Sequence, residues 1–132
     1  MFFTLACLAA PLSAQAADGQ PFRIFFDWRK PELTRDGKAM LDDVAAAYQR
    51  LKPSRVEVAG HTDRSGSNAV NMAASRRRAD EAKAYLAAHG VPTDVMTISA
   101  FGESRPIVPT ADGVREMQNR RVEISFGDIP AT

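Results

Sequence analysis

Gly60-His61-Thr62-Asp63-Arg64-Ser65-Gly66 is the stretch that decides how this chain folds. It follows the β-branched residues Val56 and Val58 and is rich in turn formers, so it predicts the end of a strand and a tight loop. A helix is predicted next, from about Asn68 to Ala88, because Gly90 and then a proline follow as stop signals. The stretch therefore joins a strand to a long helix.

One face of that helix carries an arginine among residues that are typical of a core. At 100° per residue, the positions that share this face are Asn71, Ser75, Arg78, Ala79, Ala82 and Leu86. A buried guanidinium without a partner costs several kcal/mol, and Asp63 is the nearest well-placed acid. Two roles are open for the pair. It is either a salt bridge that stabilises the fold, or a clamp that grips a zwitterion, with the carboxylate on Arg78 and the ammonium on Asp63.

The composition fits one small globular domain, with 132 residues, of which 45% are hydrophobic and 25% charged. A net charge of +1 gives no indication of a nucleic-acid or anionic membrane partner. The single cysteine, Cys7, excludes an intrachain disulfide and a cysteine-based metal cluster.

The first 16 residues are uncharged and largely apolar, and Ala14-Gln15-Ala16 has the pattern of a signal-peptidase site. Residues 1–16 are therefore predicted to be an export signal, although the usual basic start is missing, and residues 17–21 a short joint. The apolar run is shorter than the roughly 20 residues that a membrane-spanning helix needs. Two alternatives stay open: a lipid anchor on Cys7, and an ordinary N-terminus of a cytosolic protein.

The remaining pattern alternates strands and helices. The predicted elements are a strand over Phe22–Phe26, a helix over Glu32–Leu51 capped by Thr34, a strand over Arg55–His61, the helix described above, and strands over Val95–Phe101 and Arg120–Phe126. Residues 102–118 are predicted to be mostly loop, and residues 128–132 a tail. This β-α-β-α-β-β order predicts an α/β (α+β) two-layer sandwich, a small mixed sheet with its helices packed on one face. The Gly60–Gly66 loop then lies at the carboxyl end of a strand, where such sheets bind ligands.

Motif blocks also follow one another in a characteristic order. They are Gly60-His61-Thr62-Asp63-x-x-Gly66, then Asn71, Ser75 and Arg78-Ala79, then Gly102-Glu103-x-x-Pro106, and finally Asn119-Arg120-Arg121-Val122-Glu123-Ile124. Together they resemble the OmpA-like C-terminal domain over about residues 22–127. The resemblance implies a non-catalytic module of the bacterial envelope that needs no cofactor and binds peptidoglycan non-covalently, through the diaminopimelate of the stem peptide.

The resemblance also implies roles for individual residues. The family's aspartate and arginine correspond to Asp63 and Arg78, which favours the clamp, with the two groups satisfying each other or water when no ligand is bound. Asn71 and Arg120 match supporting positions, and Thr62 and Asp27 are expected to line the cleft. Departures from the family pattern at Val70, Ala74 and Arg115-Glu116 concern the rim of the cleft.

Other chemistries are weakly supported. Only His61 and His89 are available as imidazole ligands, so a zinc site is not expected, and His61 is expected to order its loop. Ser65 and Ser67 lie near His61 and could suggest the nucleophile of a hydrolase, but no oxyanion-hole signature accompanies them, so a hydrolase is not expected. The basic run that ends at Arg78 is spread around the helix, which predicts a solvated face for Arg76 and Arg77 rather than a nucleic-acid site.

We therefore expect a periplasmic peptidoglycan-binding domain, associated with the cell wall or the outer membrane, with an envelope protein as a possible further partner. The mature chain is expected to have no transmembrane span. The alternative is an envelope protein-interaction or assembly module of the same fold, in which Asp63 and Arg78 serve folding more than binding.

Overall fold

The computed structural model describes residues 20–131, so the predicted signal peptide and most of the joint lie outside the described residues. The elements are β1 (Phe22–Phe25), α2 (Arg35–Leu51), β2 (Arg55–His61), α3 (Asn68–Ala88), β3 (Met96–Ala100) and β4 (Arg121–Gly127), with short 3-10 turns η1 (Thr93–Val95) and η2 (Met117–Asn119). The predicted β-α-β-α-β-β order is confirmed. No helix within residues 20–131 combines the length and apolarity that crossing a bilayer requires.

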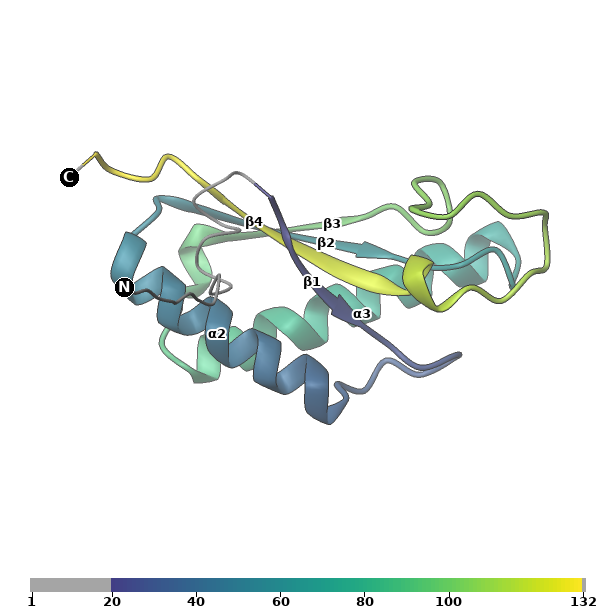
Figure 1. Ribbon diagram of the computed structural model, residues 1–132, viewed down its shortest axis with the longest axis horizontal. Helices are drawn as coiled ribbons and strands as arrows, with labels where there is room; N and C mark the ends of the chain where they lie inside the picture. The colour runs from purple at the N-terminus through teal and green to yellow at the C-terminus, as the bar shows by residue number, and fades with distance from the viewer. Residues whose placement is uncertain (1–19, 132) are drawn as a thin grey trace, which may run out of the picture.

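The four strands form one mixed sheet in the order β1-β4-β2-β3, and both helices pack on one of its faces (Figure 1). Strand β4 runs antiparallel to both of its neighbours, whereas β2 and β3 are parallel. Strands β1 and β2 therefore point the same way. Their carboxyl ends meet the start of β4 at one end of the sheet, which is where the predicted site residues are found.

Helix α2 begins where a side chain can cap it. The Thr34 Oγ1 atom accepts a hydrogen bond from the Gly37 N–H at 2.9 Å, which confirms the predicted cap and explains why the helix starts at Arg35 rather than at Glu32. The helix ends at Leu51 and is capped by Lys52, which has a φ of 52° and donates its N–H to the Tyr48 carbonyl. The predicted apolar stripe, Leu41, Val44, Ala45 and Tyr48, is buried.

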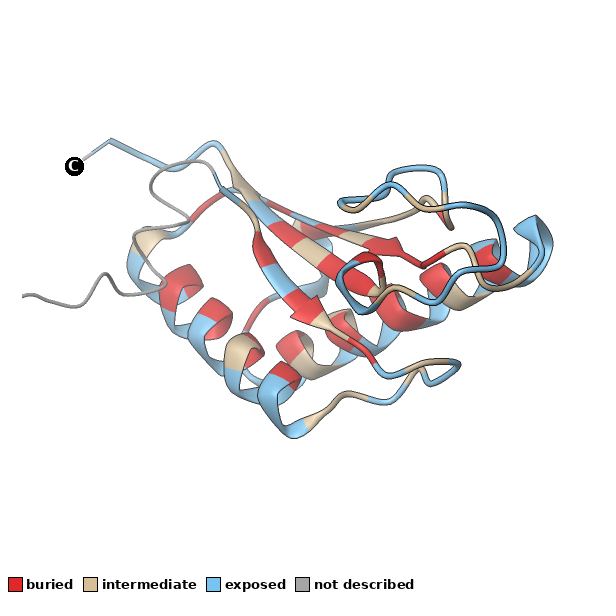
Figure 2. Ribbon diagram, turned by 45° about the vertical axis from the view of Figure 1, so that its right-hand side comes forward, coloured by how far each residue is buried: buried red, intermediate tan, exposed pale blue. Residues whose placement is uncertain are grey.

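Helix α3 has the predicted bounds, and its first turn is capped by the Ser67 hydroxyl, which accepts from the Val70 N–H at 3.2 Å. All six residues of the predicted inner face are buried, including the polar Asn71, Ser75 and Arg78. Figure 2 shows buried positions on the sides of both helices that face the sheet and exposed positions on their outer sides.

Strand β4 alternates as predicted, although it begins at Arg121 rather than at Arg120. Val122 and Ile124 belong to the core, while Arg121 and Glu123 lie on the face of the sheet that the helices leave uncovered. The aromatic side chains predicted to be core are divided. Phe22 and Phe26 are buried, whereas Phe25, Phe101 and Phe126 are half-buried.

The contact between β2 and α3 depends on a glycine. A Cβ atom added to Gly60 would lie 1.9 Å from the carbonyl oxygen of Ser75, so the strand approaches the helix backbone directly. The Ser75 hydroxyl donates to the Met72 carbonyl at 2.8 Å and accepts from the Gly102 N–H at 3.0 Å. One serine thus joins the helix, the strand and the loop after β3.

We expect Gly60→Ala to lower the free energy of unfolding by more than about 3 kcal/mol, because the methyl group meets backbone that cannot move aside. Urea unfolding followed by circular dichroism measures the change. The control is Gly113→Ala, where a Cβ meets no atom within 4 Å but φ is +82°, so the cost should stay near 1 kcal/mol. Equal costs for the two variants would contradict the close approach at Gly60.

Candidate ligand-binding site

A cleft of about 230 Å³ lies at the end of the sheet where β1 and β2 finish and β4 begins. Five of the six predicted site residues line it: Thr62, Asp63, Asn71, Arg78 and Arg120. Asp27 is placed differently. Its side chain is exposed and does not line this cleft, while its backbone carbonyl accepts a hydrogen bond from Arg78.

Arg78 is held by backbone carbonyls. Its Nε donates to the Lys30 carbonyl at 3.3 Å, its Nη1 to the His61 carbonyl at 3.3 Å, and its Nη2 to the Asp27 carbonyl at 3.2 Å. Arg78 as a whole is 3% exposed, and its guanidinium carbon lies 5.4 Å from the centre of the Phe26 ring. The arginine thereby fixes the loop after β1 against the end of β2.

A direct Asp63–Arg78 ion pair, one of the two arrangements expected for the empty site, does not form in the described part of the chain, because carbonyls satisfy Arg78 and other donors occupy Asp63. Burial lowers the pKa of Arg78 to about 10, although the negative charge of Asp63 opposes this shift. Arg78 is therefore a buried cation near a carboxylate that it does not contact.

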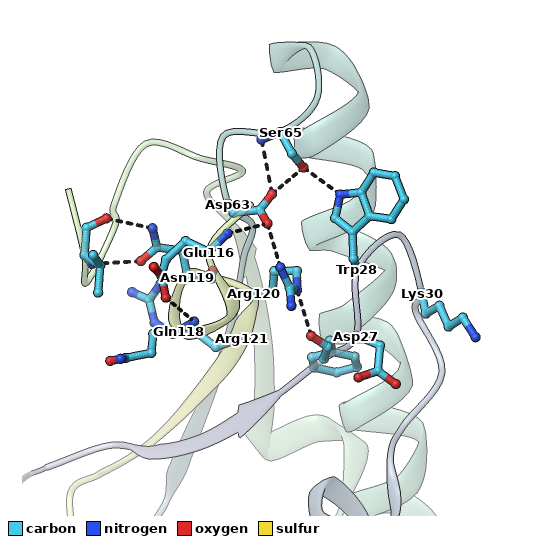
Figure 3. A network of polar contacts seen from close by, with 12 residues as sticks. Asp27, Trp28, Lys30, Asp63, Ser65, Glu116, Gln118, Asn119, Arg120 and Arg121 are labelled. Atoms are coloured by element: carbon cyan, nitrogen blue, oxygen red, sulfur yellow. Dashed lines mark hydrogen bonds and ion pairs between the residues drawn. The ribbon is translucent and has the colours of Figure 1, made fainter. Parts of the chain in front are cut away.

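Asp63 is the centre of the polar network in Figure 3. Its Oδ1 accepts from the Ser65 hydroxyl at 2.6 Å and from the Ser65 N–H at 3.2 Å. Its Oδ2 accepts from Arg120 Nη1 at 2.9 Å and from the Glu116 N–H at 3.1 Å. Burial alone would raise the pKa of Asp63, but the hydrogen bonds outweigh it and hold the pKa below its ordinary value. Asp63 thus stays ionised at neutral pH.

Trp28 and Ser65 connect two sides of the cleft, and sequence reasoning did not identify this contact. The Trp28 Nε1–H donates to the Ser65 hydroxyl oxygen at 3.0 Å, and that hydroxyl in turn donates to Asp63 (Figure 3). The guanidinium carbon of Arg115 lies 3.2 Å from the centre of the Trp28 ring, and that of Arg29 lies 4.7 Å from it. The loop after β1, the β2–α3 loop and the loop before β4 therefore meet at one tryptophan.

Thr62 and Asn71 contribute the remaining polar groups. The Thr62 Oγ1 is buried and has no hydrogen-bond partner within residues 20–131. The Asn71 amide nitrogen donates to the Glu103 carboxylate at 2.8 Å and to the Gly66 carbonyl at 3.1 Å. Thr62 thus places an unsatisfied polar group in the wall of the cleft.

His61 orders its loop through its backbone rather than through its ring. The carbonyl accepts from Arg78, while the side chain lies on the far face of the sheet beside Arg121 and stacks on Phe101 with ring centres 5.3 Å apart. Both ring nitrogens lack a partner within the described residues. Burial, aided by the charge of Arg121, lowers the pKa of His61 to about 4, so the ring is neutral at pH 7.

The long loop before β4 is tied down despite its irregular sequence. The Asn119 Oδ1 accepts from the N–H groups of Ile107 and Val108, and its Nδ2 donates to the Val108 carbonyl. Arg64 binds Glu103 and Asp112 through ion pairs and the Thr110 carbonyl through a hydrogen bond. The described residues contain no group of three or more His, Cys, Asp or Glu side chains that could hold a metal ion.

Comparisons with known proteins connect this arrangement to a family. A model of the OmpA family matches residues 25–120. The "Outer membrane protein" of Gluconacetobacter diazotrophicus is 40% identical over 109 residues, which cover 78% of this chain and 29% of the relative. Outer membrane protein A of Escherichia fergusonii is 36% identical over 117 residues, which cover 80% of this chain and 48% of the relative. The chain thus spans less than half of the length of these relatives.

Solved structures share the mixed α+β fold. The peptidoglycan-associated lipoprotein of Burkholderia pseudomallei has a TM-score of 0.72 at 23% identity, covering 79% of this chain and 88% of its own. The C-terminal domain of Helicobacter pylori MotB has a TM-score of 0.70 at 26% identity, covering 82% and 84%. The cell wall anchor of the Pseudomonas aeruginosa T6SS has a TM-score of 0.64 at 25% identity, covering 78% and 75%.

We expect Asp63→Asn to lower the free energy of unfolding by about 3 kcal/mol at pH 7, because an amide cannot accept all four hydrogen bonds and leaves Arg120 without its counter-charge. The pKa of Asp63 is lower in the folded chain than its ordinary value of 3.8. Its contribution is therefore complete above that value and is lost as the pH falls through the folded-state pKa, so the difference between variant and wild type should shrink in acid.

Urea unfolding at pH 7 and at several values below pH 4 measures this difference. The control is Asp27→Asn, an exposed carboxylate whose loss should change stability at pH 7 by less than about 0.5 kcal/mol. A pH-independent difference for Asp63→Asn would show that the charge of Asp63 does not stabilise the fold.

Proposed function

Since this chain belongs to the OmpA family, we propose that it binds peptidoglycan non-covalently, through the zwitterionic end of diaminopimelate in the stem peptide. The observation that carries the proposal is the state of Arg78. It is a buried cation that lines a cleft and has no carboxylate partner among the described residues. A ligand carboxylate would supply the missing counter-charge.

The geometry of Arg78 suits this role. A guanidinium has five N–H donors, and three of them are used on the carbonyls of Asp27, Lys30 and His61. The two Nη atoms each keep one N–H, so the carbonyls can hold the fork in place while it receives a carboxylate. Because burial lowers the pKa of Arg78, an incoming carboxylate would restore the stability of its charged form.

The ammonium of the ligand would be recognised on the Asp63 side of the cleft. Asp63 already accepts four hydrogen bonds, so an ammonium must either replace one of those donors or be held by the charge of Asp63 together with another acceptor. Thr62 would supply such an acceptor: the residue lines the cleft, and its Oγ1, which is buried and has no partner within residues 20–131, would turn toward the ligand. A carbon atom that carries both an ammonium and a carboxylate matches this neighbouring pair of groups.

The proposed setting is the periplasm, with the domain bound to the cell wall or linked to the outer membrane. The names of two solved neighbours, a peptidoglycan-associated lipoprotein and a cell wall anchor, support this setting. An outer-membrane or envelope protein is a further proposed partner, because the two relatives described above are named as outer membrane proteins and are longer than this chain.

We expect Arg78→Lys to reduce binding to purified diaminopimelate-type sacculi by at least tenfold. The lysine ammonium lacks the planar fork of N–H donors with which a guanidinium can bind three carbonyls and a carboxylate at once. The measurement is a sedimentation pull-down of the chain, with a thermal melt of every variant. Arg76→Ala is the matched control. It removes an exposed arginine of the same helix, which pairs with Asp80 on the helix surface, and should bind like wild type.

Two further outcomes decide between the proposals. Free meso-diaminopimelate should compete for the cleft, whereas Nα-acetyl-L-lysine amide, whose free end carries an ammonium but no carboxylate, should not. A folded wild-type chain that does not bind sacculi would refute peptidoglycan binding and favour the alternative, a protein-interaction module of the envelope.

A further inference from the structure

We propose that exposed arginines on the rim of the cleft bind a second carboxylate of the stem peptide, the α-carboxylate of the glutamate that precedes diaminopimelate. The site would then bind stem peptides in which this carboxylate is free more tightly than peptides in which it is a carboxamide. This inference rests on the proposed function and adds a specificity to it. The residues concerned are Arg77 on α3 and Arg29 in the loop after β1.

Positive charge exceeds negative charge in the lining of the cleft. The cationic residues there are Arg29, Lys30, Arg77, Arg78 and Arg120, and the one carboxylate is that of Asp63. Asp63 is bound to Arg120, so it does not neutralise the rim. The whole chain carries a net charge of only +1, so this excess is a local property of the cleft.

Arg77 belongs to the cleft by helical geometry. Residues at positions i, i+4 and i+7 share a helix side, and Val70, Ala74 and Arg77 line the cleft together in this way. The charge of Arg77 also contributes to the lowered pKa of Arg78, so the two guanidinium groups lie close enough to repel each other. Arg77 is exposed, as predicted from the sequence, and it is part of the cleft lining.

Arg29 approaches from the opposite loop. It has a φ of 58°, and its guanidinium lies 4.7 Å from the centre of the ring of Trp28, the residue that bonds to Ser65. Neither Arg29 nor Arg77 has an ion-pair partner among residues 20–131. The ammonium of Lys30 points away from Asp63 in Figure 3, so the two arginines are the better candidates.

A lone diaminopimelate zwitterion does not account for this excess of charge. Its free end carries one ammonium and one carboxylate and is neutral, so Asp63 and Arg78 suffice for it. In the stem peptide the preceding glutamate is linked through its side chain, which leaves its α-carboxylate free as an anion. That group is an additional negative charge next to diaminopimelate, and conversion to a carboxamide removes its charge with little change in shape.

The test measures the affinity of the chain for two soluble peptides, L-alanyl-γ-D-glutamyl-meso-diaminopimelate and its isoglutamine counterpart, by calorimetry. Wild type should bind the acid about three- to tenfold more tightly than the amide, as expected for two solvent-screened ion pairs. The preference should shrink in high salt. Arg29→Gln/Arg77→Gln should bind both peptides with the affinity that wild type has for the amide.

The matched control is Arg50→Gln/Arg76→Gln, which removes the same charge at exposed positions outside the cleft lining and should keep the preference. Equal binding of both peptides by wild type, or a preference that survives in Arg29→Gln/Arg77→Gln, would overturn the inference while peptidoglycan binding stands. Binding of neither peptide by wild type would overturn the proposed function and this inference together.

Discussion

The missing side chain at Gly60 lets β2 press against the backbone of α3 at Ser75, and the rest of the structure depends on this contact. It sets where the helix crosses the sheet, and the Ser75 hydroxyl then binds the second residue of the loop after β3, Gly102. Arg78 lies one helical turn further along, so the same contact brings its guanidinium to the His61 carbonyl. The motif therefore combines two functions: Gly60, Ser75 and Gly102 position the elements, and Arg78 is the group that they position.

The cleft combines two opposite electrostatic arrangements. Asp63 is a carboxylate whose hydrogen bonds are complete, whereas Arg78 is a cation that is solvated by carbonyls and has no counter-ion within the described chain. The carbonyl dipoles replace water around the guanidinium and so keep the arginine charged inside the protein. They do not neutralise its positive charge, as a carboxylate would. Because Asp63 also holds Arg120 and the loop before β4, the acid is a structural residue as well as a candidate ligand residue.

Much of this was predictable because local chemistry determines it. The order of the strands and helices, the bounds of β2 and α3, the Thr34 cap and the inner face of α3 follow from periodicity and capping, and the structure confirms them. The comparisons confirm the family and, with it, the prediction that the domain is not an enzyme. Sequence reasoning did not identify the partners that Arg78 and Asp63 have in the structure, because carbonyls carry no sequence signal and Arg120 is 57 residues away from Asp63. The contact of Trp28 with Ser65 depends on a loop bend at Arg29, where φ is positive, and residue types do not encode such a bend in a non-glycine residue.

The register of the sheet also determines how the domain responds to force. Residues 22 and 127 lie at the end of the sheet opposite the cleft, since Phe22 pairs with Ile124 and Arg55 with Gly127, whereas Phe25 and His61 both pair with Arg121. Tension between the start of β1 and an object held in the cleft therefore runs along the strands. It loads the hydrogen bonds between β1 and β4 in shear, so that they resist together. Tension between the two ends of the sheet domain, which leave from the same side, would peel the same strands apart one bond at a time. We therefore expect the fold to resist force best along the line that joins the start of β1 to the cleft.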